Sequence, residues 1–391
     1  MRLRFLSVLL VATQLIIWPA QANLLPEAIP AVFEQLLNQP ALANPAVVLM
    51  DGATGEIIYE KNPFAQRKPA SVMKLFAGAS VIRNLDLNSQ FTTNVSFGAE
   101  AKTLVIQGSY DPWISTSHEV ARKMQRASLS HIATLSLYRA KQRSNGSVSN
   151  FKILYSGLYS QDIANLKQFW AKKKFKPQFI AVNSEEATLN SAELITSEIS
   201  PKVSEILKWT LLWSDNNLAE RLARLSAKAA GLPFNIDGVT ILYINMLIEL
   251  GIDPSKLVIK DASGLSKENR VTAQMIGQLL YQLHEDEKYK ILFDSLPIGG
   301  VSGTLRSRFL TTAPGAVGLV RAKTGTLNGT VTLAGVVQSS DREYIFVTLA
   351  DQISNGMKAS DRARAAIDRL LGRIAAPNIP AEISEVPETH L

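Results

Sequence analysis

Three short strings in this chain contain residues that could activate a serine for acyl transfer. They are Ser71-Val72-Met73-Lys74, Ser214-Asp215-Asn216 and Lys323-Thr324-Gly325. A serine hydroxyl is a weak nucleophile until a neighbouring base takes its proton. A lysine can act as that base when burial or a nearby cation lowers its pKa. Taken together and in this order, the strings predict catalysis through a serine ester with a lysine, rather than a histidine, as the base.

Ser71 and Lys74 stand three positions apart at the start of a helix expected from Ser71 to Leu85. Residues at this spacing share one face of a helix, so the hydroxyl and the amine should be close. The amino end of the helix also favours negative charge on the serine oxygen. The same spacing recurs in Ser149 and Lys152, but this copy lies in a polar segment with no amphipathic helix after it, and we set it aside. A helix-cap serine followed by a solvated lysine would be the plain structural alternative.

The second string, Ser214-Asp215-Asn216, falls in the turn expected between two helices. Serine and asparagine are favoured helix caps, so capping alone would explain them. In an acyl-transfer site, the Ser214 hydroxyl would pass a proton between Lys74 and the leaving amine. Asn216 would hold the amide backbone of the substrate.

The third string, Lys323 to Gly325, lies with Thr326 at the end of an expected strand. Lys323 would bind a substrate carboxylate, and its charge would lower the pKa of Lys74. Thr324, Gly325 and Thr326 are expected to bind substrate, with the glycine letting it lie against the strand edge. The backbone N–H groups of Thr326 and Ser71 could form an oxyanion hole. A lysine beside a turn glycine is the structural alternative, and only the three strings together favour catalysis.

The overall composition fits a folded protein and offers few other catalytic groups. The chain has 391 residues, is 46% hydrophobic, and spreads a net charge of +7 along its length, so no nucleic-acid-binding arm is expected. There is no cysteine, which excludes disulfides, thiolate metal sites and a cysteine nucleophile. The four histidines have no metal-ligand spacing, and no G-x-S-x-G segment supports a Ser-His-Asp triad. We expect neither a metal nor another cofactor.

The first 22 residues have the pattern of a secretory signal peptide. Arg2 and Arg4 precede an apolar stretch from Phe5 to Ile17, and Ala20-Gln21-Ala22 supplies the small residues that signal peptidase requires. The apolar stretch is shorter than the roughly 20 residues that span a bilayer, which disfavours an uncleaved anchor. We expect cleavage after Ala22, export to the periplasm, and no transmembrane segment in the mature protein.

Hydrophobic patterns predict the elements that must position the three strings. Two short strands at 46–50 and 56–59 form a hairpin before the Ser71 helix. After residue 200 we expect four amphipathic helices, three strands and a closing helix, at 203–213, 218–230, 238–251, 273–284, 317–326, 330–338, 342–350 and 361–374. Because Asn328-Gly329 marks a hairpin turn, the last three strands should be antiparallel neighbours.

These elements predict an α+β fold in which both ends of the chain contribute to one five-stranded antiparallel sheet, with the helical middle packed on one side. Between the first two strings, short strand-like runs at 103–107, 151–155 and 179–182 alternate with polar segments, which predicts an inserted smaller α+β domain. The expected organisation is a signal peptide, a catalytic domain in two parts, the insert between them and a flexible tail, at 1–22, 23–90 with 198–375, 91–197 and 376–391.

The longer segments around the strings resemble those of the D-alanyl-D-alanine carboxypeptidase/endopeptidase family, the low-molecular-mass class C penicillin-binding proteins. The resemblance covers about 45–90 and 200–350. It rests on Pro69-Ala70-Ser71-Val72-Met73-Lys74-Leu75, Asp261-Ala262-Ser263-Gly264-Leu265-Ser266 with Asn269-Arg270-Val271, Leu296-Pro297-Ile298-Gly299-Gly300-Val301, Gly303-Thr304-Leu305 and Ala322-Lys323-Thr324-Gly325-Thr326-Leu327. It implies the β-lactamase/DD-peptidase-like fold.

This resemblance also implies a function, a serine DD-peptidase without a cofactor. Ser71 would be the nucleophile, Lys74 the general base, Ser214 and Asn216 would serve proton transfer and substrate positioning, and Lys323 would bind the terminal carboxylate. The substrates would be peptidoglycan stem peptides ending in D-Ala-D-Ala, or D-Ala–diaminopimelate cross-links, and β-lactams would acylate Ser71 as substrate mimics. The sequence leaves the balance between carboxypeptidase and endopeptidase activity open.

Two features depart from the family pattern, and two other functions stay open. The stretch between the first two strings is shorter than is typical of the family, and Ala262 stands where a glycine is usual. A β-lactamase would use the same layout with a carboxylate that positions the deacylating water; Glu220 and Glu268 lie near the strings, but neither has a clear case. A non-catalytic peptidoglycan-binding protein would keep the fold, although the intact polar residues weigh against it.

Overall fold

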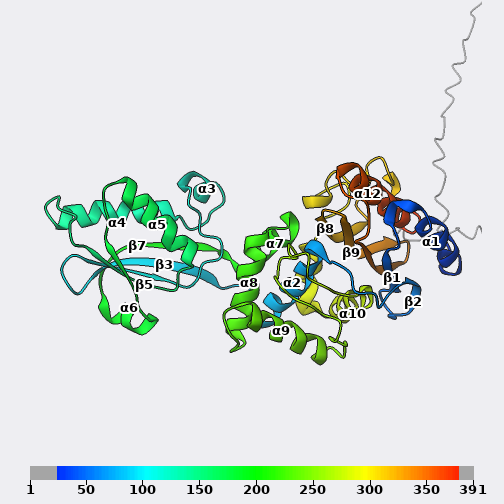
Figure 1. The fold of residues 1–391 in the computed structure, drawn as a ribbon, viewed down its shortest axis with the longest axis horizontal. Coiled ribbons are helices and arrows are strands. Elements are labelled where there is room, and N and C mark those ends of the chain that lie inside the picture. Colours follow the sequence, from blue (N-terminus) through cyan, green and yellow to red (C-terminus); the bar gives the residue numbers. More distant parts are fainter. Residues whose placement is uncertain (1–23, 378–391) are drawn as a thin grey trace, which may run out of the picture.

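We describe the protein from a computed structural model, which covers residues 24–377. The expected signal peptide and residues 378–391 of the expected tail lie outside the described residues. The described chain is elongated: a larger body with one sheet adjoins a smaller body with a second sheet (Figure 1). No helix between residues 24 and 377 has the length and apolar character needed to cross a membrane.

The sheet of the larger body joins the two ends of the chain. Its strands are β1 (Ala46–Asp51), β2 (Ile57–Lys61), β8 (Val320–Leu327), β9 (Thr330–Ser339) and β10 (Arg342–Ala350). They lie in the order β2-β1-β10-β9-β8, and every neighbouring pair is antiparallel. β1 pairs with β10, with Val48 opposite Val347. The predicted fold class, α+β with a five-stranded antiparallel sheet flanked by helices, is confirmed.

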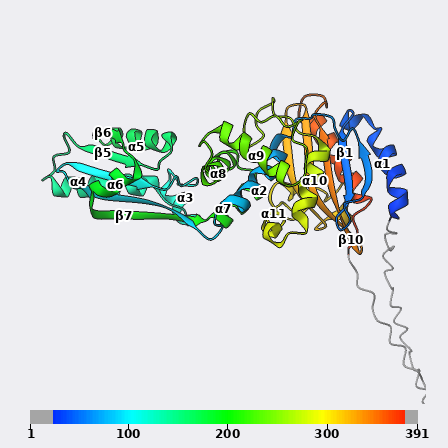
Figure 2. The ribbon, with the colours of Figure 1, turned by 90° about the horizontal axis from the view of Figure 1, so that it is seen from below.

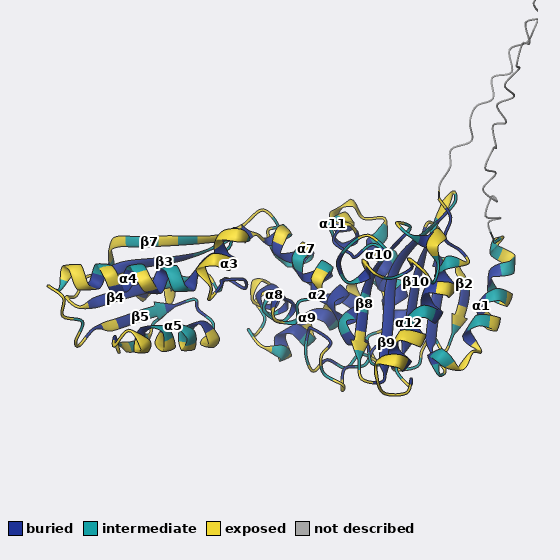
Figure 3. Cartoon of the chain, turned by 90° about the horizontal axis from the view of Figure 1, so that it is seen from above, coloured by how far each residue is buried: buried dark blue, intermediate teal, exposed yellow. Residues whose placement is uncertain are grey.

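Helices cover both faces of this sheet (Figures 2 and 3). They are α1 (Ile29–Leu37), α2 (Lys74–Asn84), α7 (Val203–Trp213), α8 (Asn216–Ala229), α9 (Ile236–Glu249), α10 (Ala273–His284), α11 (Lys290–Asp294) and α12 (Met357–Gly372). Side chains alternate between the two faces of a strand. Val48 and Met50 of β1 therefore join a core with α2 and α7 to α11, whereas Val47 and Leu49 join one with α1 and α12. The helical middle packs on one face, as predicted, and the two terminal helices cover the other.

The smaller body lies between α2 and α7 in sequence. Its elements are β3 (Gln90–Gly98), β4 (Thr103–Gly108), α3 (His118–Lys123), α4 (Leu129–Arg143), β5 (Lys152–Ser156), α5 (Ser160–Lys172), β6 (Gln178–Ala181), α6 (Ser184–Asn190) and β7 (Ser191–Lys202). The strands lie in the order β6-β5-β4-β3-β7, with β4, β5 and β6 parallel. Trp170 and Phe175 are fully buried in a core of this body. The chain enters through β3 and returns through β7 directly into α7 (Figure 1).

Candidate active site

A tight turn brings Ser71 and Lys74 together. Ser71 lies in η3 (Ala70–Met73), a single 3-10 turn that continues into α2 at Lys74. Side chains three apart eclipse each other in a 3-10 helix, and Ser71 Oγ lies 2.9 Å from Lys74 Nζ. The expected helix from Ser71 is therefore a 3-10 turn followed by an α-helix. Ala70 adopts a left-handed backbone with φ of 46°, an unfavourable conformation held directly before the serine.

Lys74 is fully buried and has three hydrogen-bond acceptors around its amine. Nζ donates to Ser71 Oγ, to Asn216 Oδ1 at 2.7 Å and to the Ser263 carbonyl at 2.7 Å. Burial lowers the pKa of Lys74 to about 8, against the opposing effect of the nearby carboxylates, of which Asp261 has the largest. When the amine loses a proton, Asn216 and Ser263 can keep two N–H donors, so the lone pair is left facing Ser71.

The three residues of the Ser214-Asp215-Asn216 string have different structural roles. Ser214 ends α7 in a left-handed conformation, with φ of 59°. The Asp215 side chain caps α8 by accepting a hydrogen bond from the Leu218 N–H at 3.0 Å. Asn216 is the first residue of α8 and faces Lys74. Asp215 therefore caps the helix that follows. Ser214 instead contacts Lys323, and Asn216 contacts Lys74.

Lys323 is the second fully buried lysine, and it lies on β8. Its Nζ donates to Ser214 Oγ at 2.9 Å and to the Thr324 carbonyl at 2.9 Å. Burial and, to a smaller extent, the charge of Lys74 hold the pKa of Lys323 well below its usual range. All the partners of both lysines are neutral oxygens, so neither charge is neutralised by a direct ion pair.

β8 is an edge strand whose outer side faces the serine turn. The Ala322 N–H donates to the Pro297 carbonyl, and the Val320 carbonyl accepts from Gly299, so the backbone groups of these alternate residues point away from β9. By the same alternation, the N–H and C=O groups of Thr324 and Thr326 point to this outer edge. A substrate strand placed there would find donors and acceptors.

Gly325 is required by the packing of β8 on the serine turn. A Cβ at this position would lie 2.1 Å from Thr332 Oγ1 and 2.9 Å from the Pro69 carbonyl. These two atoms already form a hydrogen bond of 2.8 Å, so they have little room to separate. The sequence predicts a role in substrate access for this glycine, and the packing adds a different reason, because a side chain here would collide with Thr332 and Pro69.

A loop outside the three predicted strings holds the third acceptor of Lys74, the Ser263 carbonyl. Glu220 Oε1 accepts from the N–H groups of Ala262 and Ser263 at 2.7 and 2.8 Å, which orients the Ser263 carbonyl. Gly264 has φ of 84°, and a Cβ there would lie 1.8 Å from the Ala70 carbonyl. The loop thus supports both the lysine and the serine turn. The family-like segment from Asp261 to Ser266 was the available signal.

A cavity of about 400 Å³ opens over Ser71 and Ser214. Thr304, in η5 (Gly303–Leu305), lines it, and its Oγ1 lies 2.7 Å from Thr324 Oγ1. Arg364 of α12 also lines the cavity and donates to Thr326 Oγ1 at 3.2 Å. Gly303-Thr304-Leu305 resembles a family segment, whereas nothing in the sequence pointed to Arg364.

The remaining candidates lie apart from this cavity. The second Ser-x-x-Lys copy is exposed, and Lys152 begins β5, where its amine lies 3.6 Å from Glu100. Glu268 is exposed, and Glu220 is engaged with the 261–264 loop. Among residues 24–377 no group of three or more His, Asp or Glu side chains is arranged to hold a metal ion.

Comparison with known proteins gives one family. The model of the D-Ala-D-Ala carboxypeptidase 3 (S13) family matches residues 30–143 and 159–374. Carboxypeptidase DacB of Mycolicibacterium smegmatis is 30% identical over 381 residues, which cover 84% of this chain and 81% of that protein. The D-alanyl-D-alanine carboxypeptidase of Actinomadura sp. strain R39 is 34% identical over 165 residues, 41% of this chain and 30% of that protein.

Solved structures show the same fold at lower sequence identity. Penicillin binding protein 4 of Haemophilus influenzae superposes with a TM-score of 0.66 at 17% identity, covering 88% of this chain and 97% of that one. A predatory endopeptidase of Bdellovibrio bacteriovorus, Bd3459, superposes with a TM-score of 0.57 at 16% identity, over 85% and 93%.

Proposed function

The chain belongs to the D-Ala-D-Ala carboxypeptidase 3 (S13) family, as its sequence predicts, and from this we propose that it works through an acyl-enzyme on Ser71. The observation that supports this most directly is the contact of 2.9 Å between Ser71 Oγ and Lys74 Nζ. Two neutral acceptors hold the other N–H groups of that buried amine. A lysine held in this way can take the serine proton at neutral to mildly alkaline pH.

In the acylation step, Ser71 Oγ attacks the carbonyl carbon of the penultimate D-alanine, and Lys74 Nζ takes the hydroxyl proton. The outward N–H of Thr326 and that of Ser71 stabilise the developing oxyanion. The C–N bond then breaks, and the leaving amine receives a proton through the Ser214 hydroxyl, which the buried Lys323 contacts. Water later attacks the Ser71 ester, releases the shortened peptide and restores the free hydroxyl.

Substrate recognition follows from the groups around the cavity. Lys323 binds the terminal carboxylate of the peptide, together with the Thr324 and Thr304 hydroxyls that line the catalytic cavity. Burial disfavours the charge on Lys323, and an arriving carboxylate would restore it, so the site selects an anionic end group. Asn216 and the outer edge of β8 hold the peptide backbone. The substrates are peptidoglycan stem peptides, reached in the periplasm after the signal peptide is cleaved.

The same acyl-enzyme serves two reactions that differ only in the leaving group. A carboxypeptidase releases a terminal D-alanine, and an endopeptidase releases the diaminopimelate side chain of a cross-linked peptide. β-Lactams acylate Ser71 because their strained amide takes the place of the D-Ala-D-Ala bond. Mass analysis of muropeptides after incubation with the protein separates the two reactions, since one removes a single D-alanine and the other splits cross-linked dimers.

A β-lactamase on this layout fits less well. Such an enzyme needs a carboxylate free to position the deacylating water. One carboxylate oxygen of Glu220 accepts hydrogen bonds from the backbone N–H groups of Ala262 and Ser263. The other oxygen lies 3.4 Å from the guanidinium group of Arg224. Glu268 is exposed to solvent. Slow release of bound penicillin, rather than rapid turnover of nitrocefin, is therefore expected.

The test of the proposal is covalent labelling with a fluorescent penicillin. Ser71→Ala should abolish the label, whereas Ser149→Ala, in the exposed second Ser-x-x-Lys copy, should label like the wild type. A label that persists in Ser71→Ala would refute the assignment of the nucleophile. A wild-type protein that forms no adduct but binds cell walls would favour the non-catalytic alternative.

A further inference from the structure

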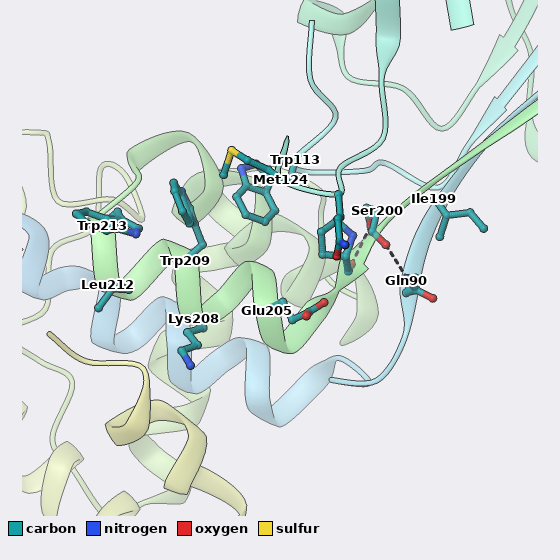
Figure 4. A pocket seen from close by; sticks show the side chains of 12 residues that line it. Gln90, Trp113, Met124, Ile199, Ser200, Glu205, Lys208, Trp209, Leu212 and Trp213 are labelled. Carbon is teal, nitrogen blue, oxygen red and sulfur yellow. Dashed lines mark hydrogen bonds between the residues drawn. The ribbon is translucent and has the colours of Figure 1, made fainter. Parts of the chain in front are cut away.

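A row of three tryptophans lines an open cavity where the two bodies of the molecule meet (Figure 4). Trp209 and Trp213 are one turn apart on α7, and Trp113 follows β4 in the smaller body. The ring centroids are 5.3 Å apart between Trp113 and Trp209 and 5.7 Å apart between Trp209 and Trp213. The cavity has a volume of about 720 Å³, within the range of roughly 300–1,000 Å³ typical of small-ligand sites. We call these residues the tryptophan row.

The row is more exposed than core packing requires. Trp213 is 39% exposed and Trp209 is half-buried, although both belong to a helix whose other face packs in the core. The rings are tilted by 46° relative to each other, so they do not cover each other's faces by stacking. Only Trp113, at 8% exposed, is mostly covered. An aromatic surface left open inside a hollow indicates a ligand with an apolar face.

The polar lining of the cavity is close to neutral. Gln90 and Gln125 offer amide groups, and the single carboxylate of Glu205 is matched by the ammonium group of Lys208. The Ser200 hydroxyl is buried and already bonded to the Phe91 N–H and the Pro201 carbonyl. Neither a strongly anionic nor a strongly cationic ligand is favoured by this set. An N-acetylated sugar has the matching chemistry, because its ring presents an apolar C–H face to an indole and its hydroxyl and acetamido groups form neutral hydrogen bonds.

The tryptophan row adjoins the catalytic cavity at the end of α7, although the two cavities share no lining residue. Trp213 directly precedes Ser214, and the guanidinium of Arg306 lies 5.5 Å from the Trp213 ring centre. Arg306 follows η5, which carries Thr304 of the catalytic cavity and packs on α7 so closely that a Cβ at Gly303 would lie 2.4 Å from the Leu212 carbonyl. A stem peptide bound at Ser71 can therefore continue along this side of α7.

We propose that the tryptophan row is a subsite for the N-acetylated sugars to which the stem peptide is attached. The proposal rests on the proposed function, since the catalytic site supplies the peptide that leads the glycan to the row. It predicts that the enzyme distinguishes a glycosylated stem peptide from the same peptide without sugars. A peptide segment in the row, such as the second strand of a cross-link, is the competing occupant.

The test compares D-alanine release from a disaccharide pentapeptide and from the same pentapeptide without sugars. The wild-type kcat/KM should be about tenfold higher for the glycosylated substrate, as aromatic contacts of this kind provide. Trp213→Ala and Trp209→Leu should each bring the ratio of the two kcat/KM values close to one. Tyr138→Ala, which removes an exposed aromatic ring of α4 outside the row, should keep the wild-type ratio. Using the ratio cancels any effect of Trp213→Ala on Ser214.

Several results would overturn the proposal. A wild-type ratio near one, or a ratio unchanged in both tryptophan variants, would show that no sugar binds there. Equal losses on both substrates would assign the row to the peptide instead. If the wild type neither releases D-alanine nor labels with penicillin, the proposed function fails, and calorimetric titration with the N-acetylglucosamine trimer still tests the row: saturable binding lost in Trp213→Ala supports it, and no binding by the wild type refutes it.

Discussion

The two bodies of the molecule differ in the solvent exposure of their lysines. Every lysine of the segment from β3 to β7 is exposed, including Lys152 of the second Ser-x-x-Lys copy. The larger body fully buries Lys74 and Lys323, although neither contacts a carboxylate. Burying such a charge costs several kcal/mol unless it is paired, and stability alone would not retain it. Burial without pairing, rather than the Ser-x-x-Lys spacing, therefore distinguishes the copy of the motif that we propose to be catalytic.

The strongest test of this contrast changes the lysine of each copy to arginine. Lys74→Arg keeps the charge but removes a base that can lose its proton, so penicillin acylation should fall by about 10³-fold, within the range that general-base catalysis contributes. Lys152→Arg should leave the rate unchanged, because Lys152 is exposed and contacts only Glu100. The measurement is the rate of fluorescent penicillin labelling. A Lys74→Arg protein that still acylates rapidly would remove Lys74 as the base.

The two bodies also differ in how far the sequence predicts them. The sheet of the larger body is built from hairpins and periodic helices, and α7, α10 and β10 have the bounds that the pattern predicts. In the smaller body the apolar runs of β4, β5 and β6 are visible in the sequence, although only β4 is buried along most of its length. β3 and β7 were missed. They pair across about a hundred residues, and β7 is polar and largely exposed, so no local pattern marks them.

At the site, the sequence predicts the catalytic side chains better than it predicts the backbone groups and long-range contacts around them. The polar residues of the three strings meet in space, as their spacing and order predicted. The acceptor provided by the Ser263 carbonyl could not be predicted, because any residue type supplies a backbone oxygen. From the sequence alone, Glu220 is a candidate only for positioning a water, since its contact with the 261–264 loop depends on tertiary structure. Arg364 reaches the cavity from α12, far along the chain from any motif.

The two bodies can also be compared by substituting one glycine in each. The comparison tests whether tight backbone packing matters more at the catalytic site than in the smaller body. Gly325→Ala places a methyl group against Thr332 and Pro69 and should push β8 away from Ser71. A displacement of about 1 Å can reduce a rate by about a hundredfold, and we expect that loss in penicillin acylation. Gly146→Ala, with nothing within 4 Å of its Cβ and φ of 87°, should cost only about 1 kcal/mol of stability. Equal acylation by the two variants would contradict the packing argument.

The pH dependence of acylation reports the buried lysine directly. Burial lowers the pKa of Lys74 to about 8, so the amine is mostly protonated at pH 7 and mostly free at pH 9. Because only the free amine can accept the serine proton, the acylation rate at saturating penicillin should rise about tenfold over this interval. A rate that is flat between pH 7 and pH 9 would contradict the role of Lys74.

The smallest expected effect comes from Glu220→Gln, which removes the charge of this carboxylate but keeps its hydrogen-bond acceptor. Its carboxylate is one of three, with Asp261 and Asp215, that favour the protonated form of Lys74 and so oppose the lowering of its pKa by burial. Glu220→Gln keeps an oxygen for the Ala262 and Ser263 N–H groups and removes the charge, so the midpoint of the acylation profile should move to lower pH and the rate at pH 7 should rise by roughly a factor of two. Glu193→Gln, whose carboxylate contacts Arg139 and Arg143 on the exposed surface of the smaller body, should not move the midpoint. A Glu220→Gln rate that falls equally at every pH would mean that the loop geometry alone matters, because a lost support lowers the rate without changing the proton affinity of Lys74.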